Sequence, residues 1–506
     1  MRSHYTGKVT CGSVDTYLNH VFKDAGWGVE GDVFHCTHAS DRDKIAQCCC
    51  LCHQHPLASQ PTIRHCFGDF IRDGRLEPSI SAMLASSVPD ESLPVTEKAE
   101  VYDCIADMLL SDPMQSLKAG TTAWCFRHLR YCPIVERIDA VAPGSTLKVD
   151  WKHKLHDDAT QADGDEYKGI IDTDAVTSTE AHIRDDFWAR VAAAAHAENS
   201  TAQPEVGKKV VDQKEELLCN VAGTSCTDYA GYGDHEGAGG ATQLAYLNWC
   251  LDILSIRPIM WWTEIAGGSI DMYRKRLGHV YNIFGVETEP LREGLPWHRC
   301  RLYCYGSCKV RVLFDGSSEE YFGLVLRRCN LVAADYLVGD EHRRLKLASQ
   351  RAARRGHVHP PAETKIPLCH QFSALTMTRI DDQMEALGFV TSSDEKSGIV
   401  IDADQNNSHT CGGWVGPCLV THATLLAVDG AKVLLPEEHL LSQGESCCCQ
   451  SEVDPKWQGC LEPLINILKR SDNGNAALVK LAGNAMNAIN LYSFKLYTLS
   501  CSKVAC

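Results

Sequence analysis

The side chain whose position most strongly suggests chemistry is Cys226. It lies in the segment NVAGTSCTDYAGYG, where an apolar run ends in polar residues and glycines. In an α/β fold, the loop that follows a buried strand is a place where ligands bind. A single cysteine is usually a small buried apolar residue, but one in such a loop could act as a nucleophile. We therefore take Cys226 as a candidate for covalent catalysis.

A carboxylate and two arginines follow in the same half of the chain. The apolar run that ends in MWWTEIAGG carries Glu264, and the short segment EGLPWHRCRLY carries Arg299 and Arg301. Neighbouring strands of one sheet would place Cys226 and Glu264 on the same rim, where the carboxyl group could act as an acid. The two arginines alternate along an expected strand and would point to one face. Paired guanidinium groups suit a phosphate or a polarised carbonyl, although an ordinary edge strand with salt bridges is the alternative.

The elements that must position these residues form two blocks of alternating strands and helices. The first block spans residues 8–70, and the alternation returns after residue 215 with an expected strand, helix and strand. Between the two blocks the chain is polar and acidic, which indicates an insertion with some helices. The pattern predicts an α/β fold.

The composition is that of a folded, acidic protein. The 506 residues are 44% hydrophobic and 23% charged, and the net charge is -16, a balance typical of globular chains. No apolar run is long enough to span a membrane, and the first residues lack the apolar stretch of a secretory signal. We therefore expect an intracellular protein without membrane attachment, whose 26 cysteines are reduced thiols.

The order of these segments resembles the motif order of cytosine-5 DNA methyltransferases. In that family a Pro-Cys turn carries the nucleophile, a Glu-Asn-Val motif the glutamate and a Gln-x-Arg-x-Arg motif two arginines; TSC, TEI and HRCR stand in these places here. The resemblance covers most of the chain outside the insertion. It implies a Rossmann-like S-adenosylmethionine-dependent methyltransferase domain with a large insertion and a smaller target-recognition lobe. It also implies that Cys226 is the nucleophile, Glu264 an acid, and Arg299 and Arg301 the groups that hold the base.

Further matches concern the methyl donor. The segment VTCGSVDTYLNHVFKDAGWG looks like the first motif of the family, with Cys11 and Gly12 in its glycine turn. The segment HCFGDF looks like the third motif, whose Asp69 would hydrogen-bond the adenine of the donor. Near the end, LPEEHLLSQG is similar to the ninth motif and AGNAM to the tenth, which would bring Gly483 and Asn484 to the donor pocket. The resemblance thus implies S-adenosylmethionine as the cofactor.

Four positions depart from the family pattern. Ser225 stands where proline is usual, Val14 where a second glycine is common, Thr37 where a glutamate binds the ribose, and Ile265 where an asparagine follows the glutamate. The changes fall mainly on donor binding. A catalytically weak or inactive relative that binds nucleic acid or a partner is therefore one alternative function, and an RNA cytosine-5 methyltransferase is another.

The stretch RRLKLASQRAARRG is the expected contact with nucleic acid. A chain with an acidic net charge can bind a polyanion only through a local basic face, although a solvated helix face is the alternative. The candidates for phosphate contacts are Arg343, Arg344, Arg351, Arg354 and Arg355. The expected organisation is a first part of the core at 1–70, an insertion at 71–215, a second part of the core at 216–309, a target-recognition region at 310–414 and a return to the core at 415–506.

Two groups of cysteines and histidines raise the question of zinc. The first group is Cys48, Cys49, Cys50, Cys52, His53 and His55, and the second is Cys125, His128 and Cys132. Neither shows two well-spaced ligand pairs, so we predict no metal, and the tract Cys447–Cys449 has the character of a loop. The predicted function is methylation of carbon 5 of cytosine in DNA, and this substrate implies a nuclear location.

Overall fold

The computed structural model describes residues 2–6, 18, 35–40, 65–67, 78–111, 122–125, 130–133, 217–223, 229, 236–359, 365–388, 398–405, 412–428, 431–445 and 474–504. Contacts divide the chain into one unit of Met1–Ile134 and Glu205–Cys506 and a second unit of Val135–Pro204. The second unit lies outside the described residues. The first part of the expected insertion, by contrast, belongs to the same unit as the core.

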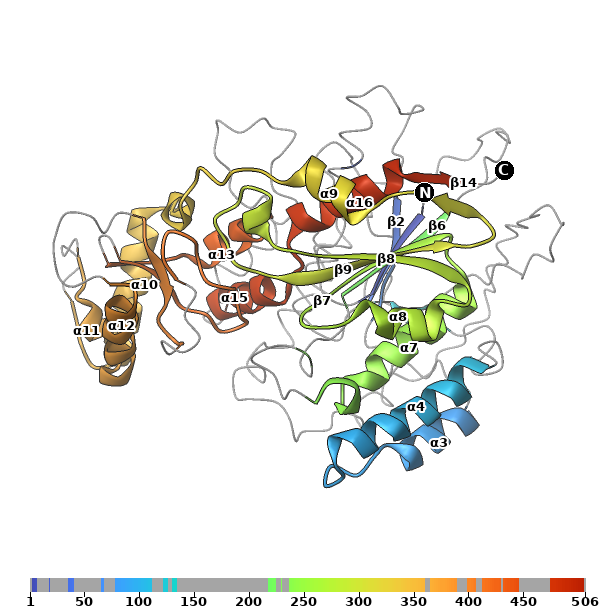
Figure 1. The fold of residues 1–506 in the computed structure, drawn as a ribbon. Coiled ribbons are helices and arrows are strands. Elements are labelled where there is room, and N and C mark those ends of the chain that lie inside the picture. Colours follow the sequence, from blue (N-terminus) through green and yellow to red (C-terminus); the bar gives the residue numbers. More distant parts are fainter. Residues whose placement is uncertain are drawn as a thin grey trace, which may run out of the picture. The chain divides into compact units, whose positions relative to one another are not determined.

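A nine-stranded sheet forms the centre of this unit, with the order β5-β4-β3-β2-β1-β6-β7-β9-β8 (Figure 1). The strands are β1 (Arg2–Thr6), β2 (His35–Ser40), β3 (His65–Phe67), β4 (Thr122–Cys125), β5 (Arg130–Pro133), β6 (Leu218–Gly223), β7 (Met260–Ile265), β8 (Tyr281–Thr288) and β9 (Arg301–Cys308). The five strands from β3 to β7 along the sheet run parallel to one another. Strand β9 is antiparallel to both β7 and β8, and β4 and β5 form an antiparallel edge.

The strand order reverses direction at the centre of the sheet. From β1 the chain proceeds outward through β2 to β3 on one side, and after returning to β6 it proceeds outward to β7 on the other. This arrangement is that of a doubly wound, Rossmann-like sheet, in which ligands bind beyond the carboxyl ends of the strands beside the reversal. The predicted Rossmann-like α/β fold class is confirmed by this topology.

Helices cover both faces of the central strands, which is why β6 and β7 are almost continuously apolar. Three helices on one face are α4 (Val95–Ser111), α7 (Gln243–Ile256) and α8 (Ile270–Leu277), which share a buried core with Trp261 and Ile265 of β7. On the other face lies α16 (Ala488–Ser500), to which Trp262 is tied by a 2.8 Å hydrogen bond from its Nε1 to Thr498 Oγ1. The side chains of β7 therefore alternate between two cores.

Local capping explains where several of these helices begin. The hydroxyl of Ser269 accepts a hydrogen bond from the backbone of Asp271 at the start of α8, and Asn487 caps α16 in the same way. Such side-chain acceptors satisfy the amide groups that the first helical turn leaves without a partner. Helix α4 is then held to α8 by ion pairs from Arg276 to Asp103 and, at 3.0 Å, to Asp107.

The remaining elements include a smaller antiparallel sheet with a core of its own. Its strands are β11 (Val400–Asp402), β12 (Leu425–Ala427) and β13 (Lys432–Val433). The helices that accompany it in the chain are α10 (Glu341–Arg354), α11 (Leu368–Gln371), α12 (Ala374–Ala386) and α13 (Pro436–Ser442). The other elements are α3 (Pro78–Ser87), η3 (Gly237–Gly239), η4 (Pro290–Arg292), β10 (Val312–Phe314), α9 (Ser318–Val325), η5 (Ala333–Tyr336), α15 (Gly474–Asn484) and β14 (Ser502–Val504). Within the described residues, no helix combines the length and the apolar character needed to cross a bilayer.

Candidate active site

The ends of β6 and β7 meet at the carboxyl edge of the sheet. The two strands pair in parallel, with Gly223 opposite Glu264. Cys226 follows Gly223 by three residues and lies outside the described residues. Three residues of chain reach at most about 11 Å, and neighbouring strands lie about 4.8 Å apart. The expected adjacency of the two strands is confirmed, and contact between the Cys226 thiol and the Glu264 carboxyl group stays a prediction.

The Glu264 carboxyl group is buried and paired with an arginine. Its Oε1 atom lies 2.9 Å from Nε of Arg301, whose side chain is 14% exposed. The pair forms because β9 runs antiparallel to β7 with Tyr303 opposite Glu264, so that β9 begins at the edge where β7 ends. The guanidinium group also donates a 2.7 Å hydrogen bond to the carbonyl of Cys300. The arrangement holds a carboxyl group and a guanidinium group together at the rim.

Arg299 occupies a different place from the one expected. Its buried guanidinium group donates hydrogen bonds to the carbonyls of Leu419 at 3.2 Å, Gly483 at 3.4 Å and Ala485 at 2.6 Å. Arg299 precedes β9, which begins at Arg301, so the alternation of side chains within a strand does not apply to it. Of the two arginines, Arg301 contacts Glu264, whereas Arg299 binds the carbonyl end of α15. We therefore interpret Arg299 as a structural residue.

The predicted donor-binding residue Gly483 is required by backbone packing. A Cβ atom at this position would lie 2.5 Å from the backbone nitrogen of Thr421, a separation at which the two segments could not stay in place. The carbonyl of Gly483 is one of the acceptors of Arg299. Asn484 is half-buried at the end of α15. Backbone packing alone therefore explains why residue 483 is a glycine. Donor binding by Gly483 and Asn484 stays a prediction.

The other predicted donor-binding residues follow strands that end at the same edge. Cys11 and Gly12 come after β1, and Asp69 comes two residues after β3; all three lie outside the described residues. Their strands run parallel to β6 and β7, so the segments leave the sheet on the side where Glu264 lies. The strand reversal beside β1 is where this kind of sheet binds ligands.

Tyr303 is a residue of this site that the sequence analysis did not single out. It is fully buried and lies directly opposite Glu264 in the register. Burial, followed by the charge of Glu264, raises the pKa of the Tyr303 hydroxyl well above its ordinary value. Among the described residues the hydroxyl has no hydrogen-bond partner. The sequence carried a signal for Tyr303. Every second residue of a strand points to the same face of the sheet, so Tyr303 could have been expected on the face of Arg301.

The basic stretch expected to contact phosphate forms α10, and its first arginines are taken up by carboxylates. Arg344 is buried and makes a two-pronged contact with Glu438, with both N–O distances at 2.9 Å. Arg343 pairs with Glu437 and donates a 3.1 Å hydrogen bond to Asn475. Buried pairs of this geometry anchor a helix. We therefore assign these two arginines to the stability of the fold rather than to phosphate contact.

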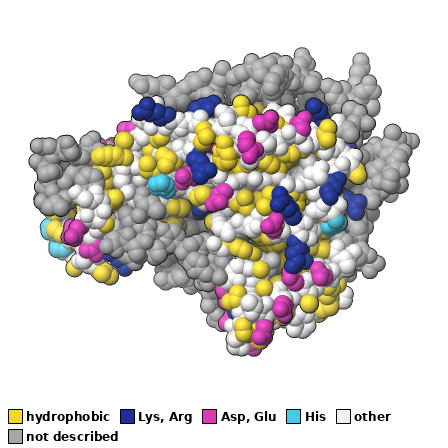
Figure 2. All heavy atoms as spheres, in the orientation of Figure 1, with side chains coloured by type: hydrophobic (Ala, Val, Ile, Leu, Met, Phe, Trp, Pro, Cys, Tyr) yellow, Lys and Arg dark blue, Asp and Glu magenta, His cyan; other side chains and the backbone are white. Residues whose placement is uncertain are grey.

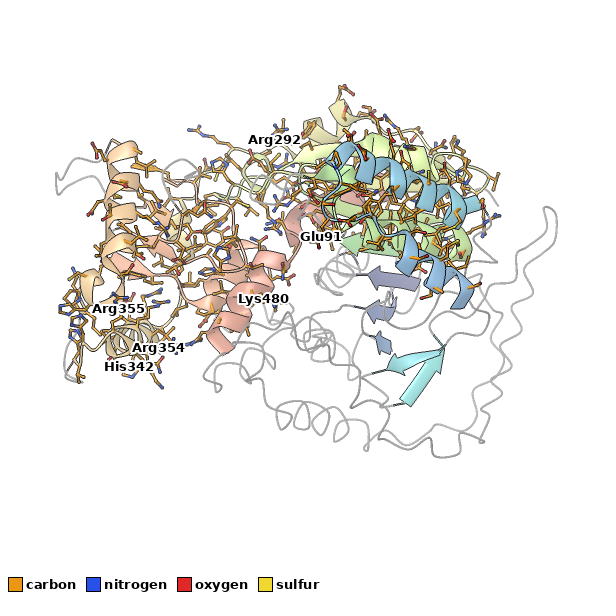
Figure 3. The ribbon with its side chains drawn as sticks, turned by 90° about the horizontal axis from the view of Figure 1, so that it is seen from below. Glu91, Arg292, His342, Arg354, Arg355 and Lys480 are labelled. Atoms are coloured by element: carbon orange, nitrogen blue, oxygen red, sulfur yellow. The ribbon has the colours of Figure 1, made fainter. Side chains whose placement is uncertain are left out.

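The last arginines of the stretch lie in different surroundings. Arg351 is half-buried in α10, and burial lowers the pKa of its guanidinium group to about 10. Arg354 and Arg355 are exposed at the end of α10 (Figure 3). Of the five predicted phosphate contacts, Arg354 and Arg355 are the two that are exposed in the described part of the chain, and binding of phosphate by them stays a prediction.

Metal binding was predicted to be absent, and most of the relevant residues lie outside the described part of the chain. This applies to the tract from Cys48 to His55, to His128 and to Cys447–Cys449. Cys125 and Cys132 lie on the paired strands β4 and β5. Within the described ranges, no three histidine, cysteine or acidic side chains are grouped in a way that could hold a metal ion.

Comparisons with known proteins give a partial likeness. No protein-family model matches the sequence, and no curated protein sequence matches it. Among solved structures, the chain is similar to the Entamoeba histolytica methyltransferase EhMeth, with a TM-score of 0.32 and 12% identity over 56% of this chain and 77% of that one. It is similar to the Schizosaccharomyces pombe Dnmt2 methyltransferase with the same TM-score, 0.32, and identity, 12%, and with coverage of 56% and 77%.

Proposed function

We propose that the chain is a cytosine-5 methyltransferase that transfers a methyl group from S-adenosylmethionine to carbon 5 of cytosine in DNA through a covalent adduct with Cys226. The observation that carries the proposal is the register of β6 and β7, with Gly223 opposite Glu264. Strand β6, which the segment with the candidate nucleophile follows in the sequence, ends beside the strand end where a buried carboxyl group and Arg301 are paired. Covalent catalysis on a base needs these groups in one place.

The methyl donor would bind in the neighbouring part of the same edge. The segments with Cys11, Gly12 and Asp69 follow the carboxyl ends of β1 and β3, beside the point where the strand order reverses. When bound, S-adenosylmethionine supplies an electrophilic methyl group on a sulfonium centre. These residues would hold the donor, and its methyl group would face the base.

Cys226 performs the first step of the proposed reaction. Carbon 5 of cytosine is a poor nucleophile, and addition of the Cys226 thiolate to carbon 6 makes it a good one, because the electron pair of the 5,6 double bond moves toward carbon 5. A free thiol with a pKa near about 8.5 is only a few per cent ionised at neutral pH. The thiol therefore loses its proton as the carbon–sulfur bond forms.

Glu264 and Arg301 stabilise the ring while the sulfur is attached. Glu264 shares a proton with ring nitrogen 3 and so offsets the negative charge that the thiolate brings. Arg301 holds the Glu264 carboxyl group in place and would donate a hydrogen bond to the exocyclic oxygen. After carbon 5 has accepted the methyl group, with S-adenosylhomocysteine as the leaving group, its proton passes to water, the carbon–sulfur bond breaks and Cys226 is released as the thiolate. The proton on ring nitrogen 3 returns to Glu264.

Access to carbon 6 requires the target base to leave the stack. In a duplex the atom is covered by neighbouring base pairs, so the base must be flipped into the site at a cost of a few kcal/mol. The proposal therefore includes a nucleic-acid surface next to the rim of the sheet.

The decisive experiment is covalent trapping with 5-fluorocytosine. The fluorine at carbon 5 cannot leave as a proton would, so an active enzyme stays attached through sulfur. The full chain is incubated with S-adenosylmethionine and a DNA duplex or an RNA hairpin that carries 5-fluorocytosine, and the adduct is located by peptide mass spectrometry. We expect an adduct at Cys226 with DNA, its loss in Cys226→Ser and a strong decrease in Glu264→Gln.

Cys300→Ser is the matched control. Cys300 is an exposed residue next to Arg301, and its thiol donates a 3.1 Å hydrogen bond to Glu287. Partial desolvation and the contact with Glu287 raise the pKa of the thiol to about 12, so it is hardly ionised at neutral pH. Its replacement should leave the adduct unchanged. Methyl transfer that persists in Cys226→Ser, or calorimetry that detects no binding of the donor, would overturn the proposal. An adduct with RNA alone would replace DNA by RNA as the substrate.

A further inference from the structure

A second group of arginines lies near the candidate site and is distinct from α10. Arg292 ends the short helix η4, and Arg327 and Arg328 follow α9. All three are exposed. The backbone joins them across a large sequence distance, because the amide of Arg327 donates a 2.9 Å hydrogen bond to the carbonyl of Arg292 and Glu293 forms a β-bridge with Arg327. We call Arg292, Arg327 and Arg328 the rim arginines.

The rim arginines differ from Arg301 and Arg344 in the partners that the described residues offer them. Arg301 is paired with Glu264 and Arg344 with Glu438. Within the described part of the chain, none of the rim arginines forms an ion pair with an acidic side chain. The acidic side chains nearby are engaged otherwise. Glu293 accepts hydrogen bonds from Tyr321, Asn490 and Ser493, and Glu289 lies 3.2 Å from His298.

Contacts within the protein hold the group in place without neutralising it. The guanidinium group of Arg292 lies over the ring of Phe322, 5.5 Å from its centroid, and Arg292 also donates to the carbonyl of Glu287. A cation held against an aromatic ring loses little freedom when it binds an anion. On the face drawn in Figure 2, Lys and Arg side chains lie among hydrophobic ones beside α9, and Figure 3 marks Arg292.

The group lies within reach of a substrate bound at the proposed active site. Strand β8 ends at Thr288, opposite Arg301 of β9, and β9 in turn pairs with β7 at Glu264. The lateral distance from β7 to β8 across two strand spacings is about 10 Å, and four more residues to Arg292 add at most about 14 Å. The sum is shorter than one turn of duplex DNA, about 34 Å.

We propose that the rim arginines bind the phosphodiester backbone of the nucleic-acid substrate beside the target base. The inference rests on the proposed function and adds the surface that it requires. In a chain of net charge -16, a polyanion must be attracted by a local cluster of unpaired cations. Exposed guanidinium groups bind phosphate oxygens through charge-assisted hydrogen bonds, and contacts with phosphates do not depend on the base sequence.

The test measures how DNA binding depends on salt. The dissociation constant of a fluorescein-labelled DNA duplex is determined by anisotropy between low and physiological salt, for the full chain and for Arg327→Gln/Arg328→Gln. Each phosphate contact contributes about 0.9 to the slope of log K against log salt. We expect weaker binding and a slope that is smaller by about 2. The further change Arg292→Gln should lower the slope by about 1 more.

The matched control is Lys309→Gln/Lys503→Gln. It removes the same charge from two exposed side chains, one just after β9 and one on β14, which pairs with β10, away from the carboxyl edge. Its slope should equal that of the unmodified chain. A rim-arginine variant with an unchanged slope overturns the inference, even where Cys226 is trapped by 5-fluorocytosine. A reduced slope without any trapping supports the inference and overturns the proposed chemistry, and a full chain that binds no DNA overturns both.

Discussion

Replacement of Arg299 by methionine separates a structural role of this residue from a catalytic one. In the fold, its guanidinium group is buried and donates to the carbonyls of Leu419, Gly483 and Ala485. Two of these acceptors terminate α15, whose last carbonyls have no partner within the helix. Methionine would keep the packing of the aliphatic stem and remove every one of these hydrogen bonds.

The size of the effect can be worked out from the contacts. The bonds to Leu419 at 3.2 Å and Ala485 at 2.6 Å are within ordinary length, whereas those to Gly483, at 3.4 Å, are marginal. A hydrogen bond to a charged group contributes about 1.5–3 kcal/mol, so two of them contribute about 3–6 kcal/mol. The methionine variant also avoids the cost of burying a charged group, and this offsets part of the loss of stability. We therefore expect a loss of about 3 kcal/mol in the free energy of unfolding.

Urea unfolding followed by tryptophan fluorescence measures this loss, since Trp297 lies two residues away. With a denaturant dependence of about 3 kcal/mol per molar urea, the midpoint should fall by about 1 M. Arg327→Met serves as control, because among the described residues this exposed side chain bonds only to the carbonyl of the preceding residue. Its replacement should leave the midpoint within about 0.2 M. An Arg299→Met variant with an unchanged midpoint and no methyl transfer would refute the structural interpretation and return Arg299 to the chemistry.

Two further predictions concern the smaller sheet and its neighbours. Arg344→Met should lower the free energy of unfolding by about 3–5 kcal/mol, because it leaves the buried carboxylate of Glu438 without its charged partner; an unchanged melting temperature would contradict this. Burial raises the pKa of the Asp402 carboxyl group to about 6, so the folded state binds a proton more readily than the unfolded state does. Stability should therefore fall as pH rises from about 4 to 6, by up to about 3 kcal/mol, and Asp402→Asn should flatten this profile. Urea midpoints across that pH range test the prediction, and parallel profiles for both proteins would disprove it.

Much of the fold could be predicted because each core strand is marked by a pattern of residues within a short stretch of sequence. The apolar runs that end at Gly223 and Ile265 are short, continuous and bounded by polar turns, which is how strands covered on both faces read in a sequence. Their order along the chain, with helices between them, leaves few topologies other than a doubly wound sheet. The prediction of an α/β fold, with Glu264 at the end of a buried strand, rested on these local properties, whereas the Rossmann-like arrangement was implied by the resemblance to cytosine-5 methyltransferases.

The use of each arginine could not be predicted in this way. A guanidinium group looks the same in the sequence whether it meets a carboxylate, a carbonyl or solvent. Arg344 is neutralised by a residue 94 positions away, and Arg299 binds a carbonyl 186 positions away. The contiguous basic stretch therefore predicted a binding face where the structure has buried ion pairs at its beginning.

The sequence by itself determined strands such as β6 and β7 and the residues placed at their carboxyl ends, because strand formation depends on apolar runs and turns within a few residues. Only the tertiary structure decided which of the charged groups remain available. It paired Arg301 with Glu264, set Tyr303 beside them and brought Arg292 to Arg327. The physical reason is that the free energy of a charge depends on burial and on partners within a few ångströms, and those partners come from distant parts of the chain.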